Sequence, residues 1–396
     1  MAYDASFDLL EPAAWNALLL SNDYPMRPAL ANANSNIEGV GIAGQVAARN
    51  KTVKIPKASK PSGDANTYEG ATYTKDDPEF TQPELKMEDV LYRSFTIDKW
   101  DQNFSLPDLV SSQVVPRIHN ILDTINKNYI KRELNRFDIA VADLNTSATV
   151  MDTTDVRFMR KALLERSFVE DQVMAAVIDP DGEFDLNGLS LFQEADKRGN
   201  NQIQLSGAMG NAFGFDFMLD NVPNDVDSTS TVGDAVVAAD AAVGAKTVTI
   251  DDGSGSGATE TLENGHVIYF GSANGRNDWY VVDSVNDAGT EITLKEPLRS
   301  AVSDDDTITG VSGSSQYFYD PSGIALITAL PVESRVTSAS GVTRIPFFEP
   351  MNRANFLISI EGDTGGADVT IETLVGAKNF QPSRGGRYLR GDTAKA

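Results

Sequence analysis

The stretch SFTIDKWDQNFSLPDLVSSQVVPRIHNILDTINKNYIKRELNRF, residues Ser94 to Phe137, sets the architecture of this chain, because an extended segment turns into a long helix within it. Ser105 and Asp108 have the spacing of a capping box, and Pro107 fits the first turn of a short helix. Pro116 lacks an amide hydrogen and its ring clashes with the preceding turn, so a second helix is predicted to start there.

One apolar stripe runs along this second helix. Its members have helical spacing: Ile118, Ile121, Leu122, Ile125 and Tyr129. At about 1.5 Å per residue, the segment from Pro116 to Asn135 makes a rod of roughly 30 Å, with three basic residues near its negative C-terminal end. A rod of this length indicates a structural framework rather than an active site.

The composition bounds the class of protein. The chain has 396 residues, 41% of them hydrophobic, which is enough for two or three compact units with real cores. A net charge of −24 argues against a broad basic face that grips nucleic acid, since phosphate contacts need clustered Lys and Arg. The absence of cysteine excludes a disulfide framework, a thiol nucleophile and a zinc–thiolate site, and it suits a reducing cytoplasm.

The N-terminus carries an apolar patch, LLEPAAWNALLL, that has the wrong flanks for a signal peptide. Asp4, Asp8 and Glu11 stand where a signal peptide has basic residues. No stretch approaches the roughly 18 apolar residues of a membrane span. We therefore expect neither secretion nor a membrane-spanning segment.

Residues 1–48 are predicted to form an N-terminal arm with one short helix near Ala13 to Leu20. From Arg49 to Lys60 the chain has five basic residues and no acidic one. Four of these basic residues recur at every third position: Lys51, Lys54, Lys57 and Lys60. Two interpretations stay open for this series, namely contact with an acidic neighbour or a phosphate, and a solvated extended loop.

Residues 49–100 together predict a long two-stranded hairpin. Residues 61–82 are rich in Pro, Gly, Asp and Thr, and the alternation from Glu84 to Ile97 predicts a strand. An isolated hairpin of this size is marginal in water, so we expect another subunit to stabilise it.

Beyond the long helix the sequence predicts a mixed unit of helices and strands. Thr153 or Thr154 could cap the first helix. The continuous apolar run Gln172 to Ile178 predicts a buried strand, which ends at a tight turn over residues 179–182. A weaker helix is predicted from Leu186 to Asp196.

Residues 223–312 differ in composition from their surroundings. They contain 16 acidic and 4 basic residues, which gives −12, half of the net charge in under a quarter of the length. Short strands are predicted at KTVTI, HVIYF, WYVVDSV and EITL, the pattern of a small antiparallel barrel or sandwich. A strand is predicted before this unit, around Phe215 to Leu219, and the mixed pattern resumes at Gln316. The β-rich unit is therefore inserted into its host.

No arrangement of residues calls for a catalytic, cofactor or metal site. His119, expected at a surface or interface, and His266 are the only imidazoles, and the GSGSG at residues 253–257 is not a nucleophile elbow. Carboxylates at every second residue from Asp179 to Asp185, and the run Asp304 to Asp306, could attract calcium, but the glycine and glutamate positions of an EF-hand loop are wrong. We interpret them as solvated turn carboxylates.

In their order, these parts resemble the major capsid (coat) proteins of tailed double-stranded-DNA bacteriophages with the Hong Kong 97 fold, most closely the podovirus type with an inserted β-domain. FTIDKWDQNFSLPDL followed by PRIHNILDTINKNYIKREL resembles the strand that enters the family's spine helix. VRFMRKALLERSFVEDQVMAAVIDPD resembles its helix, connecting turn and buried strand. GNAFGFDFMLDNVP resembles the strand before the insertion, and LVGAKNFQPSRGGRYL resembles the C-terminal strand and tail.

The resemblance implies an α+β fold. Its implied parts are the N-terminal arm (1–48), the extended loop (49–100), the peripheral domain with the spine helix (101–140), the axial domain (141–222), the inserted β-rich domain (223–312), the return to the axial domain (313–350), and the peripheral-domain strands with the C-terminal tail (351–396). The apolar stripe of the spine helix is then expected to pack on a sheet formed partly by the C-terminal strands.

The resemblance also implies a structural protein that is not an enzyme and needs no cofactor. Copies would form pentamers and hexamers of an icosahedral head shell that encloses double-stranded DNA without sequence-specific binding. The implied location is the virion capsid, assembled in the cytoplasm of a bacterial host and without a membrane partner. Implied partners are a scaffolding protein and a portal, with a decoration protein as a further candidate. The lysine series, Lys51, Lys54, Lys57 and Lys60, would then contact a neighbouring subunit.

Two alternatives stay open at this point. The first is a cargo-holding nanocompartment protein with the same fold. The second is a carbohydrate-binding or adhesive β-domain protein, although sugar sites stack aromatic rings on their ligand and the three Trp residues are widely spread.

Overall fold

The computed structural model of the chain describes residues 12–22, 24–33, 46–47, 50, 52–54, 57–58, 80–81, 83–98, 110–142, 150–165, 174–189, 209–221, 225–226, 235–251, 262–271, 279–310, 313–331, 342–363 and 366–391. Helices and strands are both present, so the predicted α+β class is confirmed. The chain divides into two compact units. The first unit comprises Met1–Pro25, Ser35–Ile121 and Ala325–Phe380, and the second comprises Met26–Asn34, Leu122–Ile324 and Gln381–Ala396.

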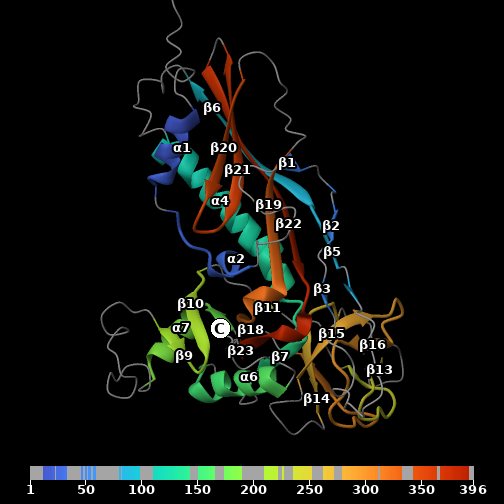
Figure 1. Ribbon diagram of the computed structural model, residues 1–396. Helices are drawn as coiled ribbons and strands as arrows, with labels where there is room; N and C mark the ends of the chain where they lie inside the picture. Colours follow the sequence, from blue (N-terminus) through green and yellow to red (C-terminus); the bar gives the residue numbers. More distant parts are fainter. Residues whose placement is uncertain are drawn as a thin grey trace, which may run out of the picture. The chain divides into compact units, whose positions relative to one another are not determined.

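The first unit is built on a six-stranded sheet of long strands (Figure 1). Its strands are β1 (Val46–Ala47), β6 (Asp89–Asp98), β19 (Ile324–Pro331), β20 (Val342–Glu349), β21 (Ala354–Asp363) and β22 (Gly366–Asn379). The order is β1–β19–β22–β21–β20, and β6 pairs with β22. β22 is central because it pairs antiparallel with both β21 and β6. In β20, buried Ile345 and Phe347 alternate with exposed Pro346 and Phe348, as a strand with one covered face requires.

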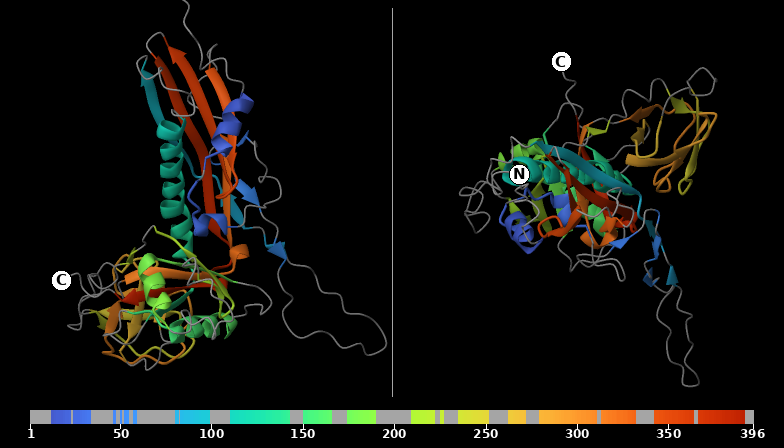
Figure 2. Two further views of the ribbon diagram at one scale, coloured as in Figure 1. Left: turned by 90° about the vertical axis from the view of Figure 1, so that its left-hand side faces the viewer. Right: turned by 90° about the horizontal axis from the view of Figure 1, so that it is seen from above.

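Two helices contribute to the first unit. Helix α1 (Pro12–Leu20), predicted near Ala13 to Leu20, packs beside β20. Helix α4 (Val115–Ile125) runs alongside β6 (Figure 2). The Arg117 guanidinium lies 3.9 Å from the centre of the Phe95 ring on β6, and Arg93 Nε donates a hydrogen bond of 2.8 Å to Asn120 Oδ1. These contacts fix the helix against the strand.

The rod predicted from Pro116 to Asn135 is confirmed, with one addition. A π-helical turn (Val110–Val114) leads directly into α4, and Pro116 lies in the first turn. A second π-helical turn (Asn126–Ile130) joins α4 to α5 (Lys131–Leu134), and nothing in the sequence predicted it. Every residue of the predicted apolar stripe is buried. The capping box predicted at Ser105 to Asp108 lies outside the described residues.

The antiparallel pairing predicted within residues 49–100 is present. The paired segments are β2 (Thr52–Lys54) with β5 (Glu84–Lys86), and β3 (Lys57–Ala58) with β4 (Phe80–Thr81). Val53, Leu85 and Met87 are buried in one apolar cluster with residues of β19 and β22. The base of the hairpin is therefore held by its own sheet, and the contribution of another subunit to its stability stays a prediction.

The second unit contains a seven-stranded sheet. Its strands are β7 (Ile139–Ala142), β8 (Met174–Ile178), β9 (Gly210–Ala212), β10 (Phe215–Leu219), β11 (Asp225–Val226), β18 (Gly313–Tyr319) and β23 (Gly385–Gly391). The order is β7–β23–β18–β8–β10–β9, with β11 paired to β18. Its helices include α2 (Pro28–Ala31), α5, α6 (Thr153–Glu165) and α7 (Pro180–Asn187). β8 is buried throughout, as its apolar run predicted.

The start of α6 differs from the prediction. The backbone N–H groups of Thr154 and Asp155 donate to Asp152 Oδ1 at 2.6 and 3.0 Å, and Asp155 Oδ2 accepts a hydrogen bond from Asp152 N at 2.9 Å. Asp152 thus caps the helix in a reciprocal arrangement. The predicted caps Thr153 and Thr154 are wrong, because a carboxylate one residue earlier reaches the same donors.

The tight turn predicted over residues 179–182 is also wrong. Asp179 is the N-cap of α7, where its Oδ1 accepts a hydrogen bond from Gly182 N at 2.6 Å, and Pro180 occupies the first helical position. An aspartate followed by proline fits a helix start as well as it fits a turn. The helix predicted from Leu186 to Asp196 shares only Leu186 and Asn187 with α7, which begins at Pro180 and ends at Asn187. The predicted range from residue 190 onward lies outside the described residues.

Residues 235–310 of the second unit form a closed antiparallel barrel. Its strands are β12 (Val236–Val237), β13 (Thr247–Asp251), β14 (Val267–Phe270), β15 (Trp279–Val285), β16 (Glu291–Leu294) and β17 (Ile308–Gly310), in the order β12–β13–β16–β15–β14–β17. Hydrogen bonds from Ile308 N to Ala235 O (3.0 Å) and from Val237 N to Asp306 O (2.9 Å) close the ring. The four predicted strands are confirmed, and the fold is the barrel rather than the sandwich.

The barrel packs against the seven-stranded sheet. Val267, Trp279 and Val281 of the barrel form one buried cluster with Ala140 of β7 and Leu389 of β23. The buried Arg387 of β23 donates a hydrogen bond to the backbone carbonyl of Gly265.

The C-terminal half divides between the sheets differently from the sequence-based ranges. β19 and β20, within residues 313–350, belong to the sheet of the first unit, whereas β23, within residues 351–396, belongs to that of the second. β23 pairs along its length with β18. At Gly385 a Cβ atom would collide with the ring of Phe137, so this strand fits its place only with glycine there.

Candidate interaction surfaces

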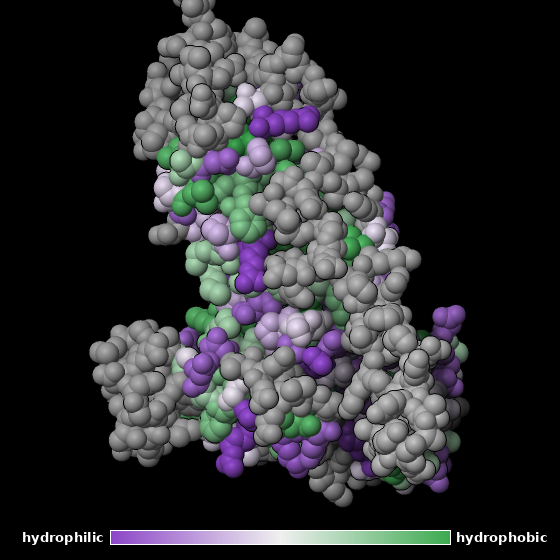
Figure 3. Space-filling view, viewed as in Figure 1, coloured by the Kyte–Doolittle hydropathy of each residue, from purple (hydrophilic) through white to green (hydrophobic). Residues whose placement is uncertain are grey.

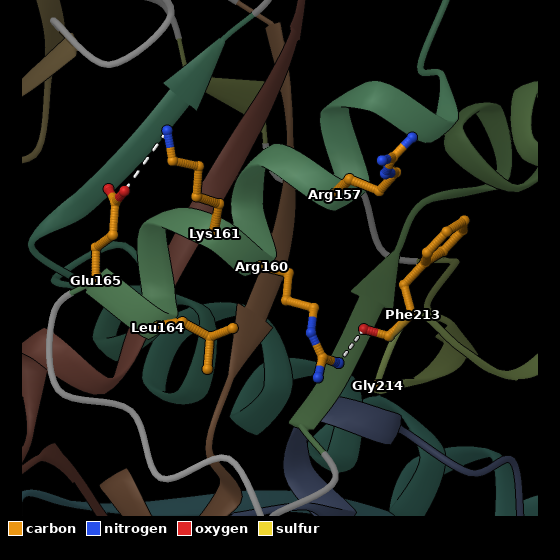
Figure 4. A pocket seen from close by; sticks show the side chains of 7 residues that line it. All are labelled: Arg157, Arg160, Lys161, Leu164, Glu165, Phe213 and Gly214. Carbon is orange, nitrogen blue, oxygen red and sulfur yellow. Dashed lines mark hydrogen bonds and ion pairs between the residues drawn. The ribbon is translucent and has the colours of Figure 1, made fainter.

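An open hollow of about 600 Å³ lies between α6 and the turn that joins β9 to β10 (Figure 4). It is lined by Arg157, Arg160, Lys161, Leu164 and Glu165 from α6 and by Phe213 and Gly214 from the turn. We call this site the basic hollow. It belongs entirely to the second unit.

Helical spacing produces the cation-rich side of the basic hollow. Residues three and four positions apart are neighbours on a helix surface, so Arg157, Arg160 and Lys161 lie together. The other face of α6 places Met159 and Leu163 in the apolar core of the unit. The sequence analysis did not single out these cations, although their spacing on a predicted helix was a usable signal.

The β9–β10 turn supplies the opposite wall. Phe213 has φ 53° and Gly214 has φ 80°, the left-handed pair that a two-residue hairpin turn needs. Arg160 Nη1 donates a hydrogen bond to the Phe213 carbonyl oxygen. The guanidinium fills the space above Gly214, where a Cβ atom would collide with it.

The basic hollow carries three cations and one carboxylate in a chain whose net charge is −24. Lys161 and Glu165 form an ion pair of 3.5 Å, but both side chains are more than half exposed, so the pair is weak. Leu164 and Phe213 provide apolar contact area. The site can therefore bind a group that combines negative charge with an apolar side chain.

A second hollow, of about 380 Å³, lies in the first unit between α1 and β20. It is lined by Asn16, Leu20, Leu330, Pro346, Phe347, Phe348 and Pro350. Figure 3 shows hydrophobic residues gathered on this face over α1 and β20. Exposed Leu20 and Phe348 make the hollow a candidate protein-contact surface.

The structure places two of the four predicted contact lysines. Lys54 lies on β2 opposite Glu84, and Lys57 lies on β3 opposite Thr81. Lys51 and Lys60 lie outside the described residues.

The carboxylates from Asp179 to Asp185 have partners within the second unit. Asp179 caps α7, and Asp185 Oδ2 lies 2.7 Å from Arg390 Nε and accepts a hydrogen bond from Met151 N at 3.0 Å. Asp181 lies 3.3 Å from Arg390 Nη1. Among the described residues, no three His, Asp or Glu side chains are grouped to hold a metal ion.

Three other residues considered as candidate site residues, namely His119, His266 and Asp306, make ring or hydrogen-bond contacts within the fold. The half-buried His119 ring lies edge-on to Tyr24, with 5.5 Å between ring centres. His266 Nδ1 accepts a hydrogen bond from Glu263 N at 3.1 Å, and Asp306 Oδ2 accepts one from Ser303 N at 2.7 Å. The GSGSG sequence at residues 253–257 lies outside the described residues. Within the described parts of the chain, every helix is too short or too polar to cross a membrane.

No family model matches the chain, and no curated protein sequence matches it. Several solved structures are similar to it. A structure from Mycobacterium phage Che8 is 13% identical with a TM-score of 0.47, over 94% of this chain and 95% of that one. The capsid structure of the cyanophage P-SCSP1u is 9% identical with a TM-score of 0.46, over 88% of this chain and 85% of that one. The capsid of Ralstonia phage GP4 is 10% identical with a TM-score of 0.43, over 95% of each chain.

Proposed function

We propose that this chain is the major capsid protein of a tailed double-stranded-DNA bacteriophage, with a Hong Kong 97-type fold and a structural role. The first unit carries the proposal: the long strands β6, β21 and β22 lie beside helix α4, and the β2–β5 hairpin is anchored in the same sheet (Figure 2). A long helix beside long strands and an anchored extended hairpin support the proposal, because the sequence resemblance implies both features.

The two units take different roles in this proposal. We assign the first unit to the arm, the extended loop and the peripheral domain, and the second unit to the axial domain. The closed barrel of residues 235–310 is the inserted β-domain of the podovirus type. We assign the chain no catalytic role.

In the proposed shell, copies of the chain form pentamers and hexamers around packaged double-stranded DNA. The net charge of −24 supports this arrangement, because an acidic shell does not trap DNA on its inner wall. A scaffolding protein, a portal and a decoration protein are the proposed further partners. Assembly takes place in the bacterial cytoplasm, and the final location is the virion capsid.

The lysine series belongs to the same proposal. Lys51, Lys54, Lys57 and Lys60 contact an acidic surface of a neighbouring subunit, which the acidic composition of the chain supplies. Reversing the charge at Lys54 and Lys57 is expected to lower the temperature at which assembled shells dissociate. Shells of unchanged stability would favour the solvated-loop interpretation instead.

Sedimentation velocity and electron micrographs of the purified chain test the proposed function. Pentamers, hexamers or closed shells are expected as the protein concentration rises. A chain that stays monomeric at every concentration and ionic strength overturns the proposal. Shells from expressing cells that enclose a protein cargo would favour the nanocompartment alternative.

A further inference from the structure

The most exposed large hydrophobic side chain among the described residues is Phe184 of α7, which is 80% exposed. Asp181 lies three residues earlier, on the same helix surface. Its carboxylate forms an ion pair of 3.3 Å with Arg390 Nη1, but the Asp181 side chain is 73% exposed, so the carboxylate can also meet a cation of a partner. An aromatic ring in this position gains from burial against a partner. We call Phe184 and Asp181 together the acidic knob.

The basic hollow has the complementary chemistry. Leu164 and Phe213 offer apolar contact to a ring, and Arg157 and Lys161 offer positive charge to a carboxylate. Guanidinium groups also bind the faces of aromatic rings. Aromatic anchors that enter a pocket beside arginine are the usual strong points of protein interfaces.

We infer that the acidic knob of one copy docks into the basic hollow of a second copy. The inference rests on the proposed function, since it requires copies of the chain to associate. The contact joins two different patches, so each copy can give its knob to one neighbour and its hollow to another. Heterologous contacts of this kind build rings when the rotation between successive copies closes.

A second copy fits the basic hollow better than nucleic acid does. The phosphates of DNA carry one charge per roughly 1.7 Å of helix axis and call for cations spread along a strip. Here the cations lie on one wall of a concave site that also contains apolar residues, and Glu165 adds a negative charge to its lining. A single side chain beside a carboxylate matches that shape.

Cysteine cross-linking tests the contact directly, because the chain contains no cysteine of its own. Asn187→Cys, three residues after Phe184 on α7, is combined with Glu165→Cys in the lining of the basic hollow, so that Phe184, Asp181 and the three cations stay in place. The protein is oxidised under assembly conditions and run on a non-reducing gel. A ladder of covalent oligomers beyond the dimer is expected, whereas each single variant can give dimers at most. The matched control pairs Glu165→Cys with a cysteine at Val243, which is 62% exposed on the barrel. Equal ladders in both pairs, or no ladder in either, overturn the contact.

Assembly measurements separate this inference from the proposed function. Phe184→Ser and Arg157→Glu are each expected to raise the concentration for half-maximal assembly by about tenfold or more, as at interface hot spots. Their unfolding midpoints should match the wild type, because both side chains are exposed. Normal assembly of both variants beside assembling wild type overturns the contact alone, whereas a wild type that never assembles overturns both proposals. An Arg157→Glu shell that forms normally but holds less nucleic acid would assign the hollow to nucleic acid and also overturn the contact.

Discussion

Lys131 and Asp220 form an ion pair in the interior of the second unit, with Lys131 Nζ 3.4 Å from Asp220 Oδ2 and side chains only 4% and 2% exposed. The same carboxylate oxygen accepts a hydrogen bond from Asn126 Nδ2 at 2.9 Å. Burial lowers the pKa of Lys131, and the nearby Asp220 carboxylate opposes that shift. The pair thus ties the π-helical turn of the rod to the end of β10.

Asp220→Ala is expected to destabilise the protein by about 3–5 kcal/mol, because it leaves the Lys131 ammonium buried without its carboxylate. Urea unfolding measures the loss. The double variant Lys131→Met/Asp220→Leu should recover most of it, since no buried charge remains. Similar losses in the single and double variants would contradict this account.

The Asp138 carboxyl should make stability depend on pH. Burial raises its pKa from 3.8 to about 6, with Lys295 opposing and Glu296 adding to the shift. The folded chain therefore keeps a proton that the unfolded chain releases, and the free energy of unfolding falls as pH rises between these two values. Above the folded pKa the contribution is constant.

Asp138→Asn should remove this dependence. Urea unfolding of both proteins between pH 4 and pH 7 measures it: the stability of the variant relative to wild type should increase up to about pH 6 and then level off. Asp287→Asn, at an exposed turn of the barrel, is the control and should follow wild type. A difference between Asp138→Asn and wild type that does not change with pH would refute the assignment.

Gly376 allows the base of the hairpin to approach β22. A Cβ atom at this position would overlap the Lys86 carbonyl oxygen and lie 3.2 Å from Met87 Cα. Gly376→Ala should therefore lower the free energy of unfolding by about 1–3 kcal/mol, as overpacking does. It should also speed hydrogen exchange at the Glu88 amide, which donates to Val375 O at 2.9 Å.

Gly323→Ala is the matched control for this substitution, because the nearest atoms to its added Cβ lie at 3.6 Å. In Gly323→Ala, the free energy of unfolding and the hydrogen-exchange rate of the Glu88 amide should both stay close to wild type. A loss of stability at Gly323 as large as that at Gly376 would refute crowding against Lys86 as the cause.

The cap of α6 can be tested against the caps that the sequence suggested. Asp152→Ala should lower the free energy of unfolding by about 1 kcal/mol, because two backbone donors lose their acceptor. Thr153→Ala and Thr154→Ala should each lower the free energy of unfolding by less than Asp152→Ala does. Thermal unfolding of the three variants decides the order, and a larger loss at either threonine would restore the original prediction.

The sequence predicted those elements whose signal is local. The stripe from Ile118 to Ile125 repeats with the helical period, so the rod could be predicted and all four residues are buried. The π-helical turn could not, because its buried Asn126 pairs with Asp220, 94 positions away. The order of the strands in each sheet depends on equally distant pairing, and for that reason the sequence could not predict to which sheet β19, β20 and β23 belong.

For the same reason, only the α6 wall of the basic hollow could be predicted from the sequence. Arg157, Arg160 and Lys161 are visible as a cluster once α6 is predicted. Phe213 and Gly214 come from a turn more than fifty positions away, as the Arg160–Phe213 separation of 53 shows. Only the folded sheet brings this wall to the helix.

The chain segments before and after the barrel meet in the seven-stranded sheet. β11 and β18 pair antiparallel there, with Val226 opposite Gly313 and Asp225 opposite Ser314. Within the seven-stranded sheet, β11 and β18 are therefore paired like the two strands of a hairpin, and the barrel lies between them in the sequence. The whole barrel can therefore be gained, lost or exchanged in evolution without a change in the order of the host strands. A foreign domain can be inserted at the same junction.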